Sequence, residues 1–224
     1  MNKTTQLSSY NAGENIYAKS IKIVESLVEG NNHFNAYSYL EKQIVKRVIH
    51  ATSDISYAET VFFTNDSAEK TIKLLKEKTA KKEPLKIVCD SEMTRAGISK
   101  NVNRDVILDL NCYINSTKMF PSIEETKSAF SIKLAVNEIF PDIIVIGNAP
   151  TALIAAMEHC GNLYKTTDYR PSLIIGMPVG FIGAAESKIK LYENDFFNAI
   201  GNFGNSGGSS SAAAVMNALL RESL

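Results

Sequence analysis

The sequence is short of net charge, cysteine and long apolar runs, and each shortage excludes a class of protein. Its 224 residues contain 24 Lys and Arg against 24 Asp and Glu, so no overall charge attracts nucleic acid or an anionic membrane. No stretch approaches the roughly 18 apolar residues of a membrane span, and the first residues lack the basic patch and apolar core of a secretory signal. We therefore expect a cytoplasmic protein that binds neither nucleic acid nor a membrane.

Cysteine and histidine are also too few and too scattered to predict a metal site. The three cysteines, Cys89, Cys112 and Cys160, include no pair at zinc-ligand spacing. The three histidines form neither an H-x-x-x-H nor an H-x-E pattern. We expect reduced, buried thiols and no bound metal.

Length and periodicity predict one α/β domain that spans residues 1–224. With 45% hydrophobic residues, the chain can bury one large core. Four apolar runs of strand length alternate with helical patterns, which is typical of a parallel sheet. These runs are 85–90, 105–110, 142–147 and 172–180. A shorter strand-like run covers 59–64. We expect a mostly parallel sheet with helices on both faces.

Apolar residues at intervals of three or four predict the helices. Residues 37–50 carry one clear apolar stripe, and residues 14–30 form another helix that stops at Gly30. The face of the 14–30 helix expected to be buried consists of Ile16, Ile21, Val24 and Leu27.

Polar residues predict where two further helices begin. Asp66 is the expected N-cap of a helix that continues to residue 83. Ser122 and Glu125 have the spacing of a capping box, at the start of a helix ending near residue 140. Other helices are expected after the third and fourth apolar strands and at the C-terminus.

Two glycine-containing loops follow predicted strands, at the edge where open α/β sheets bind ligands. In VIGNAPTAL (145–153), Gly147, Asn148 and Pro150 favour a helix start whose backbone amides point outward as an anion site. In GMPVGFIGAAESK (176–188), glycines precede a helix in the same way. Each loop could equally be a tight turn with no ligand, and neither has a dinucleotide or P-loop fingerprint.

His50, in RVIHATSD (47–54), is the histidine with the most informative position. It ends a predicted helix, whose terminal carbonyls stabilise the imidazolium form by roughly 0.3–1 kcal/mol, so it would be a good proton donor near neutral pH. His33 and His159 have the sequence surroundings of ordinary solvated or capping residues. From the residues alone, the favoured interpretation of His50 is a histidine that contacts the last carbonyls of its own helix.

Several motifs together resemble the precorrin-8X methylmutase (precorrin isomerase) family. The three that carry the resemblance are RVIHATSD, GNAPTALIAAMEH (147–159) and GMPVGFIGAAESK, in this order. Further matching segments are NIYAKSIKIV (15–24), CDSEMTRAGIS (89–99), ETKSAF (125–130) and GGSSSAAAVMNAL (207–219). The resemblance extends over nearly the whole chain.

The resemblance implies an isomerase of cobalamin biosynthesis that moves a methyl group from C-11 to C-12 of precorrin-8X or cobalt-precorrin-8. The product is hydrogenobyrinic acid or its cobalt-containing counterpart, cobyrinic acid. The resemblance further implies that no cofactor is needed and that the site is closed between two subunits of a homodimer. His50 takes the catalytic position, where it hydrogen-bonds or protonates a pyrroline nitrogen so that the methyl shift becomes easier.

The resemblance also implies the residues that bind the tetrapyrrole. They are Ser20, Ser99, Lys127, Asn148, Gly180, Gly207 and Gly208. The chain departs from the family pattern at three places. Lys127 replaces the usual arginine and loses its bidentate fork, Ser53 replaces a common glycine, and no arginine precedes Gly207. Carboxylate binding near Gly207 and Gly208 would then depend on backbone amides.

Two other functions remain open at this level. A non-catalytic corrinoid carrier would bind the same tetrapyrrole without changing it. A phosphate-binding α/β enzyme would use the loops of Asn148 and Gly180, although the missing phosphate fingerprints count against it. The sequence also leaves open whether the natural substrate contains cobalt.

Overall fold

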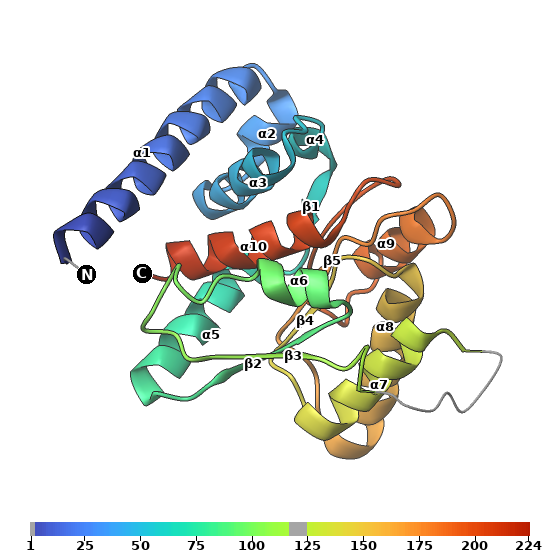
Figure 1. Ribbon diagram of the computed structural model, residues 1–224. Helices are drawn as coiled ribbons and strands as arrows, with labels where there is room; N and C mark the ends of the chain where they lie inside the picture. The colour runs from blue at the N-terminus through green and yellow to red at the C-terminus, as the bar shows by residue number, and fades with distance from the viewer. Residues whose placement is uncertain (1–2, 117–124) are drawn as a thin grey trace.

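The structure is a computed structural model that describes residues 3–116 and 125–224, with side chains from residue 13 onward. Helices and strands alternate along most of the chain (Figure 1). In chain order the elements are α1 (Lys3–Val28), α2 (Asn32–Ala36), α3 (Tyr39–Thr52), α4 (Tyr57–Thr60), β1 (Val61–Phe63), α5 (Ser67–Lys81), β2 (Leu85–Cys89), α6 (Glu92–Gly97), β3 (Leu108–Cys112), α7 (Lys127–Ile139), β4 (Ile143–Ile146), α8 (Pro150–Thr167), β5 (Leu173–Gly176), α9 (Ala184–Tyr192), β6 (Ala199–Asn202) and α10 (Ser209–Glu222).

The strands form one sheet in the order β1-β6-β5-β4-β2-β3. Every pairing is parallel except that of β1 with β6, so the expected mostly parallel sheet is confirmed. The strand order reverses at β2, which pairs with β3 on one side and β4 on the other. Open α/β sheets leave a crevice outside the carboxyl ends of the strands at such a reversal, here between the ends of β2 and β4.

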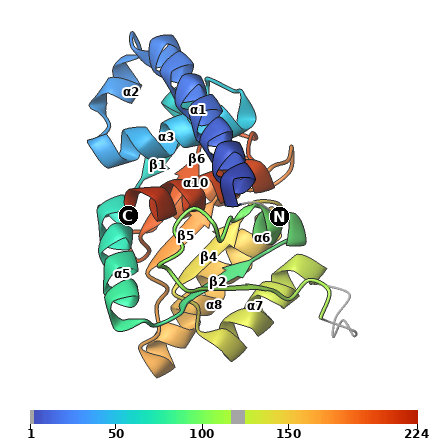
Figure 2. The same cartoon turned by 60° about the vertical axis from the view of Figure 1, so that its left-hand side comes forward.

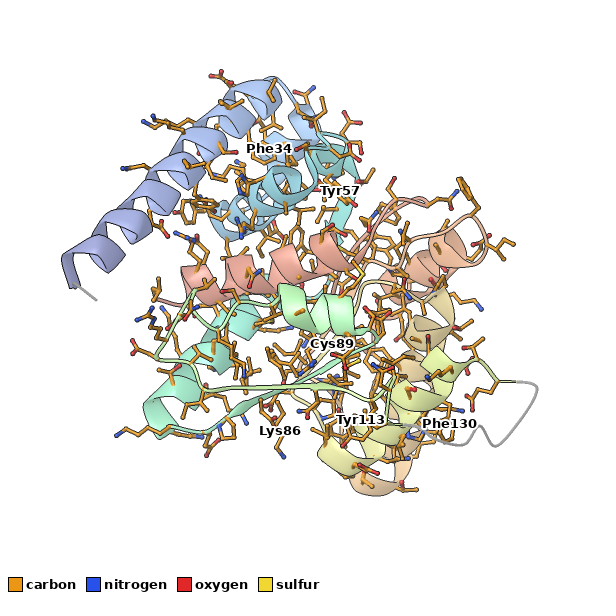
Figure 3. All side chains as sticks on the ribbon, viewed as in Figure 1. Phe34, Tyr57, Lys86, Cys89, Tyr113 and Phe130 are labelled. Carbon is orange, nitrogen blue, oxygen red and sulfur yellow. The ribbon has the colours of Figure 1, made fainter. Side chains whose placement is uncertain are left out.

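Helices cover both faces of the sheet (Figure 2). Neighbouring strand residues point to opposite faces, so Ile87 joins a core with α3, α5 and α10, while Val88 joins a core with α7 and α8. On the first face the layers are stacked: α10 lies on the sheet, α3 packs on α10, and α1 packs on α3 (Figure 1). The short helices α2 and α4 contribute Phe34 and Tyr57, which are buried on this side of the sheet (Figure 3).

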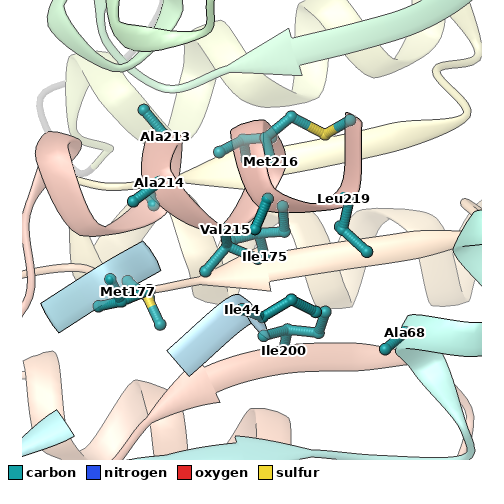
Figure 4. Close-up of a cluster of buried hydrophobic side chains, with 14 of the residues drawn as sticks. Ile44, Ala68, Ile175, Met177, Ile200, Ala213, Ala214, Val215, Met216 and Leu219 are labelled. Atoms are coloured by element: carbon teal, nitrogen blue, oxygen red, sulfur yellow. The ribbon is translucent and has the colours of Figure 1, made fainter. Parts of the chain in front are cut away.

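The innermost helix of this stack, α10, is buried along almost its whole length. Small side chains such as Ala213 and Ala214 alternate with Val215, Met216 and Leu219 above Ile175 of the sheet (Figure 4). A helix that is apolar on all sides is typical of an interior position. The alanines let neighbouring elements come close: a Cβ added to Gly97 of α6 would lie 2.8 Å from the Cβ of Ala213.

The prediction of which residues of the first helix are buried is partly wrong. Val24 is buried, but the side chains of Ile16 and Leu27 are 68% and 59% exposed. The face packed on α3 is instead rotated toward Tyr17 and Val28, because α1 carries two adjacent apolar faces and α3 covers only one of them.

Several element boundaries also differ from expectation. The α7 helix begins at Lys127, where Thr126 is the N-cap and accepts a hydrogen bond from the Ala129 amide; the proposed cap Ser122 lies outside the described residues. The third strand runs over Leu108–Cys112 rather than 105–110. Asp66 precedes α5 but makes no capping hydrogen bond through its side chain, because its backbone is left-handed (φ 53°).

Candidate active site

His50 lies in the last turn of α3 and contacts α1. Its Nδ1 is 2.7 Å from Oγ of Ser20, and the Tyr17 ring stands edge-on to the imidazole, with centroids 5.1 Å apart. The alternative that His50 contacts the last carbonyls of its own helix is therefore wrong, because Ser20 takes the Nδ1 position. Ser53 closes the helix instead, and its amide donates to the Ile49 carbonyl.

The backbone conformation of Ser53 is one that favours glycine, the residue common at this position in the family pattern. Its backbone is left-handed, with φ 57°, a conformation that glycine adopts without steric cost. Serine keeps the same backbone here, so the departure from the family pattern preserves the geometry of the turn that follows His50.

Two guanidinium groups stack on the Tyr17 ring, which in turn contacts this histidine. The Arg47 carbon Cζ is 5.1 Å from the centre of the Tyr17 ring, and that of Arg221 is 4.4 Å from it. Burial, together with the charge of Arg47, lowers the pKa of His50 below its usual 6.5. Burial and the charge of Arg47 therefore oppose the stabilisation of the imidazolium expected from the helix terminus, and favour the neutral imidazole.

A neutral His50 has a defined hydrogen-bonding role. When the Ser20 hydroxyl donates to Nδ1, the ring proton must be on Nε2, which then becomes a donor. In that arrangement the pair of residues presents one N–H to any group that approaches the open side of the imidazole.

The amides predicted to form an anion site after β4 are already occupied. Oδ2 of Asp90 accepts hydrogen bonds from the amides of Asn148 and Ala149, both at 2.8 Å, and Oδ1 accepts from Gly147 at 3.0 Å. Asp90 comes directly after β2, so its carboxylate fills the crevice between β2 and β4. The prediction that these amides are open to a ligand is wrong, because the protein supplies its own anion. The same occupancy removes the main support for a phosphate-binding enzyme.

Gly180, Gly207 and Gly208 come together at the ends of β5 and β6. The Gly180 amide donates to the Asn205 carbonyl, and the Gly208 amide donates to the Met177 carbonyl. A Cβ on Gly207 would lie 2.4 Å from the Met177 carbonyl oxygen, so only glycine fits. Gly180 and Gly208 have φ of 147° and 136°, a region that side chains rarely adopt.

A buried lysine lies beneath these loops. The side chain of Lys188, from α9, is fully buried, and its Nζ donates to the Ser206 carbonyl at 2.6 Å. Nδ2 of Asn202 donates to the same carbonyl at 2.7 Å. Burial lowers the pKa of Lys188 to about 8. Lys188 thus fixes the chain just before Gly207.

The remaining predicted residues lie apart from His50. The Ser99 amide donates to Oδ1 of Asn217 in α10, and the Ser99 hydroxyl accepts from the Asn101 amide. Lys127 begins α7 on the other face of the sheet and is exposed, as is the Asn148 side chain. In the part of the chain that the structure describes, no hydrogen bond joins His50 and Ser20 to these residues or to the three glycines.

Cys89 and Cys160 are buried as expected, whereas Cys112 is only partly buried. Over residues 3–116 and 125–224 no three His, Cys, Asp or Glu side chains gather as metal ligands. Cys89, Cys112 and Cys160 are free thiols. His159 lies within α8 and is paired with Asn137 at 2.8 Å. None of the helices in the described ranges is both long and apolar enough to cross a bilayer.

Comparison with known proteins identifies the family. The precorrin-8X methylmutase family model matches residues 15–222. The chain belongs to the precorrin-8X methylmutase family. It is 34% identical to the cobalt-precorrin-8 methylmutase of Methanocaldococcus jannaschii, with 93% of each chain covered. It is 32% identical to the cobalt-precorrin-8 methylmutase of Salmonella typhimurium, over 92% of this chain and 94% of that protein.

Solved structures agree with this family. A precorrin-8X methylmutase related protein superposes with a TM-score of 0.74 at 31% identity, covering 91% of this chain and 100% of the other. The precorrin-8X methylmutase of Thermus thermophilus gives a TM-score of 0.75 at 28% identity, covering 93% and 96%. The resemblance inferred from the motifs is therefore confirmed over the full fold.

Sequence reasoning missed three residues that shape the site. Asp90 was visible as an acidic residue directly after a buried strand, but its amide partners are 57 to 59 residues away. Tyr17 and Arg47 sit one turn from Ser20 and His50 on their helices, a spacing that places them on the same faces. That spacing could have indicated from the sequence that Tyr17 and Arg47 lie near Ser20 and His50.

Proposed function

We propose that this isomerase of cobalamin biosynthesis moves the C-11 methyl group of precorrin-8X, or of its cobalt form, to C-12. Substrate and product of such a shift are isomers, so the C-11 to methyl bond breaks, the C-12 to methyl bond forms, and no atom is gained or lost. The match of residues 15–222 to the family, together with a histidine whose Nδ1 is paired with Ser20, supports this reaction.

The proposed role of His50 is to polarise the ring system by donating from Nε2 to a pyrroline nitrogen. When the Ser20 hydroxyl is the donor to Nδ1, the imidazole has the tautomer that can do this. A donor aimed at the atom where charge develops lowers the barrier without any net proton transfer. Should the step need full protonation, a bound carboxylate near Arg47 would offset the positive charge that lowers the pKa of His50.

We further propose that local groups, rather than net charge, bind the carboxylates of the tetrapyrrole. The loops of Gly180, Gly207 and Gly208 would provide backbone amides, and the Ser99 hydroxyl, the Lys127 ammonium and the Asn148 amide side chain would provide single donors. Since the Asn148 backbone amide is already bound to Asp90, only its exposed side chain is assigned to substrate.

A homodimer with the site at the subunit interface accounts for the apolar residues left exposed. Ile16, Ile23 and Leu27 form a continuous exposed face along α1, since their spacings of seven and four residues keep them on one side of a helix. Phe181 and Ile182, beside Gly180, are 93% and 91% exposed. A second copy that covers these side chains would also close the tetrapyrrole site.

The proposal extends to organisation and location. We infer that residues 1–224 act as one domain, because α1 packs on α3 and Glu14 pairs with Arg221 of α10, joining the two ends of the chain. We also place the enzyme in the cytoplasm, since its free thiols fit a reducing compartment.

Single-turnover absorbance tests the proposed reaction against a corrinoid carrier. The wild-type protein is mixed with either form of the precursor, and the yellow-to-orange change that marks the methyl shift is followed. We expect turnover with the wild type and none with His50→Ala, while His50→Ala still binds the corrin product. Binding of the precursor by the wild type without a change of chromophore would favour the carrier; a fully active His50→Ala enzyme would refute the role of His50.

A further inference from the structure

The segments after β2 and β4 and the start of α10 meet at a cluster of hydroxyl and carboxylate groups, in which Asp90 and Thr94 are buried and Ser91 and Ser209 are partly buried. Oγ1 of Thr94 in α6 lies 3.3 Å from Oδ1 of Asp90 and 2.9 Å from Oγ of Ser209, the first residue of α10. Ser91 completes the cluster, with its Oγ 2.8 Å from Thr94 Oγ1 and 3.3 Å from Ser209 Oγ. The ends of β2 and β4 and the start of α10 are therefore tied to each other by side chains.

The cluster leaves no room for adjustment. A Cβ on Gly147 would lie 2.7 Å from Thr94 Oγ1 and 2.8 Å from Cα of Ser209, so the loop after β4 touches α6 and α10 directly. Asp90 is only 3% exposed. Three amide donors on one buried carboxylate form a rigid arrangement, and an unpaired set of buried amides would cost considerably more than a missing surface contact.

We propose that Asp90 is a positioning residue for substrate binding: its carboxylate fixes the loop of Asn148 and, through Thr94, the start of α10 next to Gly208, so that both can hold tetrapyrrole carboxylates. The inference rests on the proposed function and names one residue that shapes its binding site. Asp90 itself contacts no substrate, because its oxygens are occupied by the protein's own donors.

This role distinguishes binding from chemistry. His50 and Ser20 belong to α3 and α1, and neither is hydrogen-bonded to Asp90. Loss of the Asp90 carboxylate should therefore weaken affinity for the macrocycle and leave kcat at saturating substrate much less affected. A residue that served stability alone would lower the melting temperature without changing the affinity of the folded fraction.

Asp90→Ala with added formate tests the proposal. Truncation to alanine removes the carboxylate, and formate can occupy the vacated amides. In absorbance titrations with the corrin product, we expect Kd to rise roughly ten- to a hundredfold, the range for hydrogen bonds to a charged group, and to recover with formate but not with chloride at equal ionic strength. Asp109→Asn, which removes an exposed carboxylate from neighbouring β3, is the matched control and should bind as wild type.

The outcomes separate this inference from the proposed function. An unchanged Kd in folded Asp90→Ala, or a raised Kd that formate leaves unaltered, overturns the positioning role. If Asp90→Ala does not fold, Thr94→Val keeps the Asp90 to amide bonds and removes the hydroxyl that joins Asp90 and Ser91 to Ser209; we expect a severalfold rise in Kd, and a wild-type Kd would again overturn the proposal. Absence of turnover in the wild type would refute the proposed function instead.

Discussion

Oγ of Ser20 lies 2.7 Å from Nδ1 of His50, and this contact joins helix α1 to the last turn of helix α3. The serine occupies Nδ1 and leaves Nε2 free, and when its hydroxyl donates to Nδ1 the proton that the histidine can offer is on Nε2. The same contact makes the orientation of the imidazole depend on a helix that packs mainly on α3.

Ser20→Ala should reduce turnover without abolishing it. Loss of one hydrogen bond to the imidazole, worth about 1 kcal/mol, frees the ring to adopt either tautomer, so we expect kcat to fall roughly three- to tenfold. Ser26→Ala is the matched control on the same helix, where the hydroxyl only donates to the Ile23 carbonyl. The test is to measure the single-turnover rates of the two variants. Equal rates for Ser20→Ala and Ser26→Ala would show that Ser20 does not orient His50.

Arg47→Met should raise the pKa of His50 toward its ordinary value. Burial and the charge of Arg47 both favour the neutral imidazole, and methionine keeps much of the side-chain volume while removing the charge. The pKa can be followed by NMR titration of the imidazole carbon-bound protons. The pKa of His159, which burial and Lys133 lower, should stay the same. A wild-type His50 that titrates above 6.5 would contradict the assignment of a neutral resting state.

Lys188→Met should remove a contribution to stability that grows with pH in the alkaline range. Burial lowers the pKa of Lys188 from 10.5 to about 8, so between these values the unfolded chain holds a proton that the folded chain has lost. Lys188 therefore contributes a rise in the free energy of unfolding with pH in this window, of about 2 kcal/mol between pH 8 and 10, and this contribution is lost as pH falls through 8.

Urea denaturation at several pH values measures this difference. Lys188→Met should lack the rise, while Lys190→Met, on the exposed side of the same helix, should keep it. Parallel curves for the wild type and Lys188→Met would mean that the ammonium group is not buried in the folded protein.

Gly207→Ala and Gly161→Ala should change stability in opposite directions. An added Cβ at Gly207 would lie 2.4 Å from the Met177 carbonyl oxygen and 2.7 Å from that of Pro178, and overpacking of this kind costs about 1–3 kcal/mol. At Gly161, inside α8, nothing lies within 4 Å of the added atom, and alanine stabilises a helix by up to about 1 kcal/mol. Thermal denaturation should show a lower Tm for the first variant and a higher one for the second.

The fold was largely predictable because its strongest signals are local. The buried strands β2, β4 and β5 are continuous apolar runs, and α3 carries a regular stripe of buried residues. The β6 strand was missed because the four residues of its AIGN segment include Gly201 and Asn202. Its place in the sheet is set by pairing with β5 and β1, which no local pattern reveals.

The candidate site was less predictable because contacts between distant segments decide it. The motif around Asn148 has the residues of an anion-binding helix start, and nothing near it in the sequence indicates that Asp90 binds those amides. Likewise, the helix terminus at His50 favours a charged imidazole, whereas Arg47 and burial reverse that preference. In both cases a local rule was correct and a tertiary contact outweighed it.

The buried helix α10 has a consequence for how the enzyme can evolve. Its first residue adjoins the glycine loops, and Arg221 near its other end stacks on Tyr17 beside His50. A helix of 14 residues is about 20 Å long, so this one element sets the separation between the two halves of the site. Point substitutions elsewhere can retune either half, but inserting or deleting a single residue in α10 would turn one half about 100° relative to the other.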